Sequence, residues 1–333
     1  MRSGVVVRQL DPKAAEPETL ETWCAVFTAG RAVESGTAQD PVALAQDLRS
    51  RAPDASVHRW AAWLDGRLVG AAQAQREWNI SYCRLYVSPA YRTRGLGRGL
   101  LAAVLAGVEG WHVTVLRGSV VAGSSGERFA TRLGAQVAVR MVVLVQRIDD
   151  AALVEKLQTL QAPGGSAWRL AHWRASAPEQ LIDSYAVAKR SILDAPDAEL
   201  QVQGDPWDTV RVRQWEDDVR RRSHELWVAT AVDPGTGAVA GFTEVEVSSS
   251  HTASQHDTVV LPEQRGRGMG AWLKAAMTLR LRRDRPDIIA LTSTVNVRNA
   301  RMLALNRRLG YRETLRRLLV QADVRTVRRR LWP

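Results

Sequence analysis

Short hydrophobic segments separated by polar turns dominate the second half of the chain. Leu226 to Val232 and Val239 to Val247 read as strands, and the "DPGTG" segment between them is typical of a hairpin turn. Helical spacing of apolar residues, together with the strand pattern, predicts further elements. The predicted helices are Pro178–Leu193, Val210–Arg222, Gly268–Arg283 and Asn299–Leu309, and the predicted strands are Trp168–Arg174, Gln255–Leu261, Ile288–Thr294 and Arg312–Gln321. An early meander followed by alternating helices and strands indicates an α/β fold with a mixed sheet.

The same pattern occurs twice. Val87 to Ala103 reads "VSPAYRTRGLGRGLLAA", and Val260 to Ala276 reads "VLPEQRGRGMGAWLKAA", with a constant offset of 173 residues. The flanking strands and the later helix also correspond, so the repeat covers a whole folding unit. We therefore expect two tandem domains of one fold: an N-terminal domain at 1–150, a linker at 151–166 rich in Pro and Gly near its end, and a C-terminal domain at 167–333.

Size and composition fit a protein with two ordinary domains. The chain has 333 residues, of which 45% are hydrophobic, enough for two cores. No apolar run approaches the length of a membrane span, and no secretory signal is evident, so we expect a cytoplasmic protein without membrane contact. Cys24 and Cys83 are the two cysteines and form neither a disulfide scaffold nor a cluster of metal ligands, so no metal is expected.

The charge of the chain is strongly positive. The formal net charge is +11, but 42 of the 46 basic residues are arginine, which favours the coding bias of a high-GC genome over a selected polyanion-binding surface. Motifs typical of nucleic-acid binding are not found, so a nucleic-acid partner is not expected. The basic "VRRRLWP" end is interpreted as a solvated chain terminus.

Each repeat contains a glycine-rich loop between a strand and a helix. The segments Arg92–Gly97 and Arg265–Gly270 share the pattern Arg-x-x-Gly-x-Gly. Glycines let backbone N–H groups converge at the helix N-terminus, which makes a concavity suited to an anion such as pyrophosphate. The spacing differs from the dinucleotide fingerprint and from the P-loop. A plain glycine N-cap on a surface helix is the alternative, and the duplication argues against it.

These loops resemble the Arg/Gln-x-x-Gly-x-Gly/Ala motif of the GNAT acetyltransferase superfamily, and the second half resembles tandem members of actinomycete type. The resemblance covers nearly the whole chain and implies that the loop binds the pyrophosphate of acetyl-CoA, while the preceding strand binds its pantetheine. The implied cofactor-binding residues are Leu85, Tyr86, Val87, Arg92, Arg94, Gly95 and Gly97 in the first copy, and Thr258, Val259, Val260, Arg265, Gly266, Arg267, Gly268, Met269, Gly270 and Asn299 in the second.

The family places a tyrosine acid on its last helix, and here the matching position is Asn306. An amide does not protonate a thiolate, so Asn306 is expected either to orient the thiol or to be a helix-surface residue. In the first domain the asparagine and tyrosine positions are Gly123 and Ala130, which predicts a degenerate site. The expected oxyanion donor of the second domain is the N–H of Val259 or Val260.

Candidate bases lie on two predicted strands of the second domain. Glu244 and Glu246 are two residues apart and share a face, and Gln255 and Asp257 do the same on the next strand. Together they would form an acidic pocket suited to a cationic amine, and a solvated strand face is the alternative. His251 and His256 are interpreted as loop residues.

The resulting hypothesis is an acetyl-CoA-dependent N-acetyltransferase. Its acceptor would be a primary amine of a small molecule, such as an antibiotic or a biosynthetic intermediate, a class that comes from the family resemblance. Acetylation of a protein amine and a non-catalytic acyl-CoA sensor or scaffold are the alternatives. The sequence indicates neither the acceptor nor an oligomeric state.

Overall fold

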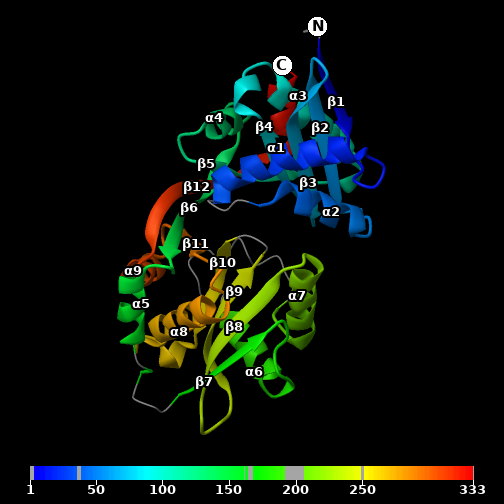
Figure 1. Cartoon of the computed structure of the whole chain (residues 1–333). Helices are drawn as coiled ribbons and strands as arrows, with labels where there is room; N and C mark the ends of the chain where they lie inside the picture. Colours follow the sequence, from blue (N-terminus) through cyan, green and yellow to red (C-terminus); the bar gives the residue numbers. More distant parts are fainter. Residues whose placement is uncertain are drawn as a thin grey trace. The chain divides into compact units, whose positions relative to one another are not determined.

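A computed structural model of the chain describes residues 4–35, 39–160, 162–163, 168–191, 206–248 and 251–332. The chain forms two compact units (Figure 1), and each contains residues from both halves of the sequence. The first unit is Met1–Met141 together with Leu315–Pro333, and the second is Val142–Thr314. Residues 161 and 164–166 of the expected linker lie outside the described residues, whereas its beginning forms helix α5. None of the described helices is both long and apolar enough to span a membrane.

The first unit has a mixed sheet with the order β1-β2-β3-β4-β5-β12. Helix α1 covers the sheet because Leu20, Trp23, Cys24 and Phe27 recur on one side of it and are buried. Its elements are β1 (Val5–Gln9), α1 (Pro17–Ser35), α2 (Pro41–Ser50), β2 (Val57–Leu64), β3 (Arg67–Glu77), β4 (Ile80–Val87), α3 (Leu96–Gly107), β5 (Val115–Val121), α4 (Ser125–Arg132), β12 (Arg312–Asp323) and α10 (Val324–Leu331).

The second unit repeats this architecture with the sheet order β6-β11-β10-β9-β8-β7. Helices α6 and α7 pack on one face of the sheet, and α5, α8 and α9 pack on the other (Figure 1). Its elements are β6 (Gln136–Arg147), α5 (Ala151–Gln158), β7 (Arg169–Arg174), α6 (Glu179–Arg190), α7 (Thr209–Arg221), β8 (Glu225–Val232), β9 (Val239–Val247), β10 (Thr252–Val260), α8 (Met269–Asp284), β11 (Ala290–Asn296) and α9 (Ala300–Arg308).

The last strand of the chain completes the sheet of the first unit. Strand β12 pairs with β5 in antiparallel register, from Arg317 opposite Val121 to Asp323 opposite Val115. The compact units therefore differ from a linear division of the sequence at residues 150 and 167, since Leu315–Pro333 belongs with the first half of the chain. The last strands of the two repeats, β6 and β12, have the same local pattern. The pattern therefore does not indicate which neighbouring strand each of them pairs with.

The basic C-terminal segment is a helix, so its interpretation as a solvated chain end was wrong. Asp323 caps α10 by accepting a hydrogen bond from the N–H of Thr326 at 3.0 Å. Val327 and Leu331 are buried in a cluster that includes Leu101 of α3. The arginines of α10 lie between these apolar positions, and that spacing is what anchors the helix.

Candidate active site

Strand β10 loses one of its neighbours halfway along. Its parallel pairing with β11 runs from Thr252 opposite Ala290 to Gln255 opposite Ser293, and no pair follows although both strands are fully described. On its other side β10 stays paired with β9 as far as Val260 opposite Gly241. The C-terminal half of β10 therefore presents an open edge with backbone groups that are not used in the sheet.

A β-bulge lies where this open edge begins. The register with β9 shifts between Gln255 and Thr258. The extra residue turns two consecutive side chains to one face: His256 Nε2 is 2.9 Å from Glu246 Oε2, and Asp257 Oδ2 is 4.0 Å from Lys189 Nζ. Gln255 instead donates to Thr243 Oγ1 at 2.9 Å, on the opposite face. The expectation that Gln255 and Asp257 face the same side was thus wrong, because it assumed a regular strand.

The glycine-rich loop of the second unit follows directly after β10. Gly266 and Gly268 have φ of 81° and 90°, and a Cβ at either would point into open space. Gly268 is the N-cap of α8, no side chain caps the helix, and the first helical bond runs from the N–H of Trp272 to the carbonyl of Gly268 at 3.1 Å. The N–H groups of the first helical turn therefore have no partner within the helix.

The first arginine of the motif closes the loop itself. Arg265 Nε donates to the carbonyl oxygen of Val260 at 2.9 Å, and in the first unit Arg92 Nε donates to Val87 at 3.0 Å. These side chains fold back onto the end of the preceding strand. The second arginines contact loop neighbours: Arg267 Nη1 is 3.5 Å from Gln264 Oε1, and Arg94 lies 5.7 Å from the ring centre of Tyr91.

The loop of the first unit has nearly the same backbone. Gly95 caps α3 with φ of 90°, and Thr93 takes the place of Gly266 with φ of 64°, a strained value for a β-branched residue. A Cβ at Gly97 would lie 3.9 Å from Leu85, close to the strand. Strand β4 has no bulge, and the side chain of Tyr86 is buried against α1.

Both expected bases of β9 are buried and paired, so they are not residues of a solvated strand face. Glu244 has no exposed surface and accepts hydrogen bonds from Tyr185 Oη and, at 2.5 Å, from Lys189 Nζ. Burial, and next the charge of Glu244, hold the pKa of Tyr185 well above its ordinary value. The ring of Trp207 lies 4.2 Å from Lys189 Nζ. Glu244 is thus the buried counter-ion of a lysine.

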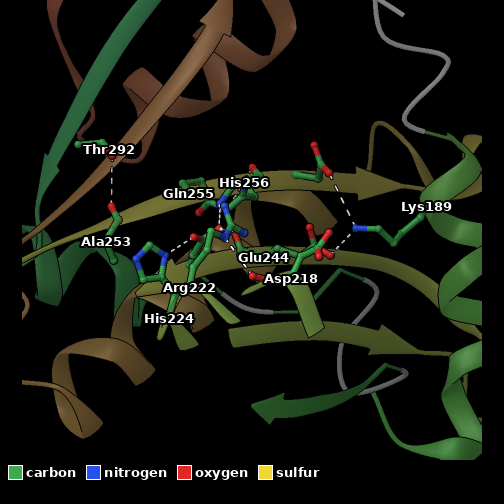
Figure 2. A network of polar contacts seen from close by, with 11 residues as sticks. Lys189, Asp218, Arg222, His224, Glu244, Ala253, Gln255, His256 and Thr292 are labelled. Carbon is green, nitrogen blue, oxygen red and sulfur yellow. Dashed lines mark hydrogen bonds and ion pairs between the residues drawn. The ribbon is translucent and has the colours of Figure 1, made fainter. Parts of the chain in front are cut away.

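Glu246 lies at the centre of a second network, and Figure 2 shows its partners His224, His256 and Arg222. His224 Nδ1 and His256 Nε2 contact its two oxygens, and Arg222 Nη2 lies 3.3 Å from Oε2. Burial alone would raise the pKa of Glu246, but hydrogen bonds from both histidines hold it well below its ordinary range. Burial lowers the pKa of His256, and the Glu246 carboxylate more than offsets this, so the net shift is upward. His256 lies on strand β10, so its interpretation as a loop residue was wrong.

Asp257 differs from the two glutamates because its side chain is 40% exposed. It lies at the bulge, and its contact with Lys189 is looser than that of Glu244. Among the three predicted carboxylates, Asp257 is therefore the one that a molecule entering from solvent reaches first.

The two asparagines of the family pattern have different environments. Asn299 caps α9, accepting a hydrogen bond from the N–H of Met302 at 3.0 Å. Asn306 has no exposed surface, so the alternative of a helix-surface residue was wrong. Its Nδ2 lies 3.5 Å from Ser293 Oγ, at the last paired position of β11, and its buried Oδ1 has no partner among the described residues. Asn306 thus lies beside the point where β10 and β11 separate.

Sequence reasoning missed the partners of the carboxylates. Tyr185 and Lys189 are four residues apart on α6, a spacing that puts both on one helix face, but nothing in the sequence pairs that face with β9. His224 and Arg222 lie at and just beyond the end of α7, where residue type suggests solvent exposure. No group of three or more His, Cys, Asp or Glu side chains able to hold a metal occurs in the described part of the chain.

A mixed sheet with a strand that leads into a glycine-rich helix start is the architecture expected from the acyltransferase resemblance. The sequence model of the acetyltransferase (GNAT) family matches residues 21–123 and 190–311. The chain therefore belongs to the GNAT family and carries its fold twice in tandem.

Similar proteins agree with this assignment. The chain is 32% identical over 250 residues to a mycothiol acetyltransferase of Clavibacter michiganensis subsp. michiganensis, covering 75% of the chain and 74% of that protein. A tandem GNAT protein from the clavulanic acid biosynthesis pathway superposes with a TM-score of 0.78 at 24% identity, covering 96% and 98% of the two chains. A GNAT protein of Sphaerobacter thermophilus superposes with a TM-score of 0.67 at 15% identity, covering 97% of each chain.

Proposed function

We propose that the second unit transfers an acetyl group from acetyl-CoA to the primary amine of a small molecule. The observation that carries this proposal is the open edge of β10, which leads directly into an uncapped helix N-terminus. An extended pantetheine amide fits an unpaired strand edge, and a pyrophosphate fits the converging N–H groups at Gly268 and the first turn of α8.

Strand alternation favours Val260 over Val259 as the oxyanion donor. Leu261 donates to the carbonyl of Ala240 on β9 at 2.9 Å. Because backbone groups alternate in direction along an antiparallel strand, Val259 also faces β9, and the N–H of Val260 faces the open edge. The Val260 carbonyl accepts the side chain of Arg265, which holds this peptide in place. A donor fixed in this way would stabilise the developing oxyanion of the thioester carbonyl.

Asp257 is the proposed general base. Glu246 is a poor proton acceptor because its pKa is held low, and Glu244 is enclosed by Tyr185 and Lys189. Asp257 would take a proton from the acceptor ammonium, directly or through water, so that the nitrogen lone pair attacks the thioester carbon. The carbon–sulfur bond then breaks and the electron pair leaves on the sulfur. The attached nitrogen then loses its second proton, which water would pass on to the thiolate, so that the products are the neutral amide and the CoA thiol. Asn306 would donate a hydrogen bond to the departing thiolate.

The acceptor class has support from one relative. The Clavibacter relative is a mycothiol acetyltransferase by name, and it matches three quarters of this chain. Asp257 is the carboxylate of this sheet face that is 40% exposed, and it would pair with a cationic amine. The first unit has Arg84 at the position of Asp257 and lacks the bulge, so we assign the chemistry to the second unit.

Release of free CoA from acetyl-CoA, measured with a panel of small amines and a lysine-containing peptide, tests the proposal. Asp257→Asn is expected to lower kcat by about 100-fold. Asp217→Asn, on an exposed and ion-paired residue of α7, is the matched control and should leave turnover unchanged. Activity with the peptide alone would favour a protein acetyltransferase. Binding of acetyl-CoA without turnover on any amine would favour a sensor.

A further inference from the structure

The first unit has a different charge at the position that matches the proposed base of the second unit. At the repeat offset of 173 residues, Arg84 of β4 corresponds to Asp257 of β10. Strand β4 pairs regularly with β3 from Gly70 opposite Val87 to Glu77 opposite Ile80, so no bulge redirects its side chains. Arg84 therefore points to the same face as its neighbours two residues away, Tyr82 and Tyr86. Its guanidinium lies 4.7 Å from the ring centre of Tyr82.

Two further arginines approach this face from other elements. Arg31 lies on α1 and Arg317 lies on β12, and both are near enough to Glu34 for their charges to act on it, as is Arg84. None of the three guanidinium groups makes a hydrogen bond or an ion pair with another described residue, and Arg317 Nε is buried without a partner. Arg213 and Arg285, by contrast, form ion pairs with Glu216 and Glu225.

Glu34 compensates these charges only weakly. It accepts a hydrogen bond from Tyr86 Oη at 2.9 Å and lies within ion-pair distance of no described arginine. Burial raises the pKa of Glu34 above its ordinary value, against the opposing effects of Tyr86 and of the arginines. Arg84 and Arg317 are half-buried and Arg31 is exposed, so the cluster keeps an excess of positive charge that a bound anion would offset.

A hydroxyl group completes the cluster. Ser119 of β5 lies opposite Leu319 of β12, and strand alternation places its side chain on the same sheet face as Arg317. Ser119 Oγ is buried and has no hydrogen-bond partner among the described residues. Guanidinium groups with a nearby hydroxyl donor are the groups that bind carboxylates and phosphates.

We propose that Arg31, Arg84 and Arg317, with Ser119, form a binding site in the first unit for a small ligand that bears a carboxylate or phosphate group. The site takes the place of the amine-binding face of the second unit and has the opposite charge. The inference concerns the first unit alone and does not rest on acetyl transfer by the second.

Calorimetric titration of the whole chain with inorganic phosphate and with malonate, at constant ionic strength in chloride, tests the site and distinguishes the two oxyanions. We expect saturable binding of at least one of them. Arg84→Gln and Arg317→Gln should each weaken it about tenfold, since each removes a charge-assisted hydrogen bond. Glu34→Gln keeps an acceptor for Tyr86 and removes the negative charge, so it should strengthen binding. Arg67→Gln, on an exposed arginine of β3, should change nothing.

The arginine variants and Glu34→Gln are expected to change the binding affinity in opposite directions. Thermal unfolding of each variant shows whether the first unit remains folded, and Glu34→Gln reports on the site even if an arginine variant does not fold. Failure of both anions to bind, or equal affinity in the wild type, in Arg84→Gln and in Glu34→Gln, would overturn the proposal.

Discussion

Lys189 and Glu244 form a fully buried ion pair, with Nζ 2.5 Å from Oε1 and both side chains 1% exposed. Tyr185 donates a hydrogen bond to the same carboxylate oxygen, so two side chains of helix α6 bind strand β9. The attraction between the two charges offsets part of the desolvation penalty of burying Glu244. The pair also places Lys189 Nζ 4.0 Å from Asp257 Oδ2.

Removing the lysine should destabilise the second unit. Lys189→Met leaves Glu244 buried without its counter-ion, and we expect a loss of about 3–5 kcal/mol in the free energy of unfolding, measured by urea titration. The double variant Lys189→Met/Glu244→Gln should recover part of this loss because it removes the uncompensated charge. Lys156→Met, on an exposed residue of α5, is the control. A single variant as stable as this control would contradict the role of the pair.

The network around Glu246 predicts a stability maximum in mildly acidic solution. The lowered pKa of Glu246 gives stability that is present above about pH 4.3, the value of an unfolded glutamate, and is lost as the pH falls below it. The raised pKa of His256 gives stability that is present below about pH 6.5 and is lost as the pH rises through the folded value.

The difference in unfolding free energy between the wild type and Glu246→Gln measures this network. We expect it to be largest between about pH 4.5 and 6.5, on the order of 1–3 kcal/mol, and to shrink on both sides. Glu263→Gln, at an exposed position, should show no such dependence. A difference that is constant from pH 3.5 to 8 would count against the network.

A buried lysine predicts a second pH dependence. Lys274 on α8 is 2% exposed and lies 4.9 Å from the ring centre of Tyr311. Burial lowers its pKa from 10.5 to about 7. Between these values the unfolded chain binds a proton that the folded protein does not, so stability should rise as the pH increases from about 7 to about 10.

Lys274→Met should therefore stabilise the protein most at pH 7 and below, by on the order of a few kcal/mol, and progressively less toward pH 10. Urea unfolding at pH 6, 8 and 10 provides the comparison with wild type. If the gain did not depend on pH, the amine would have to be charged in the folded protein.

The C-terminal helix should contribute to the stability of the first unit. Leu331 is 4% exposed and packs in the cluster that contains Leu101 and Leu105 of α3, directly behind the first glycine-rich loop. Leu331→Asp buries an unpaired carboxylate there, and we expect a loss of at least about 3 kcal/mol by thermal or urea unfolding. Trp332→Asp changes an exposed neighbour and should cost less than about 0.5 kcal/mol. Equal effects would mean that α10 does not pack on α3.

Local pattern predicted much of this molecule. The repeat at Val87 and Val260 indicated two copies of one fold, and the strand β9 has the predicted bounds Val239–Val247. The left-handed glycines at the start of α3 and α8 agree with the reason given for the glycine pattern. These features depend on residues that are close in the sequence, and a local sequence pattern describes only such residues.

Features that depend on distant contacts were not predictable in this way. The bulge between Gln255 and Thr258 adds one residue to a strand whose composition is unchanged, so the faces of Gln255 and Asp257 were assigned as for a regular strand. The pairing of β12 with β5 needs a choice between two equivalent sheets. Lys189 reaches Glu244 across 55 residues of chain, and only the packing of α6 on β9 makes them partners.

The most direct test of the account compares one substitution in the two loops. Gly268 and Gly95 have the same φ of 90° and open space at the Cβ position, so glutamate introduces equal backbone strain and charge at either site. Release of CoA from acetyl-CoA with an accepted amine should fall by at least about 100-fold in Gly268→Glu and stay within about twofold of wild type in Gly95→Glu. Loss of turnover in Gly95→Glu with retention in Gly268→Glu would contradict the assignment of acetyl transfer to the second unit.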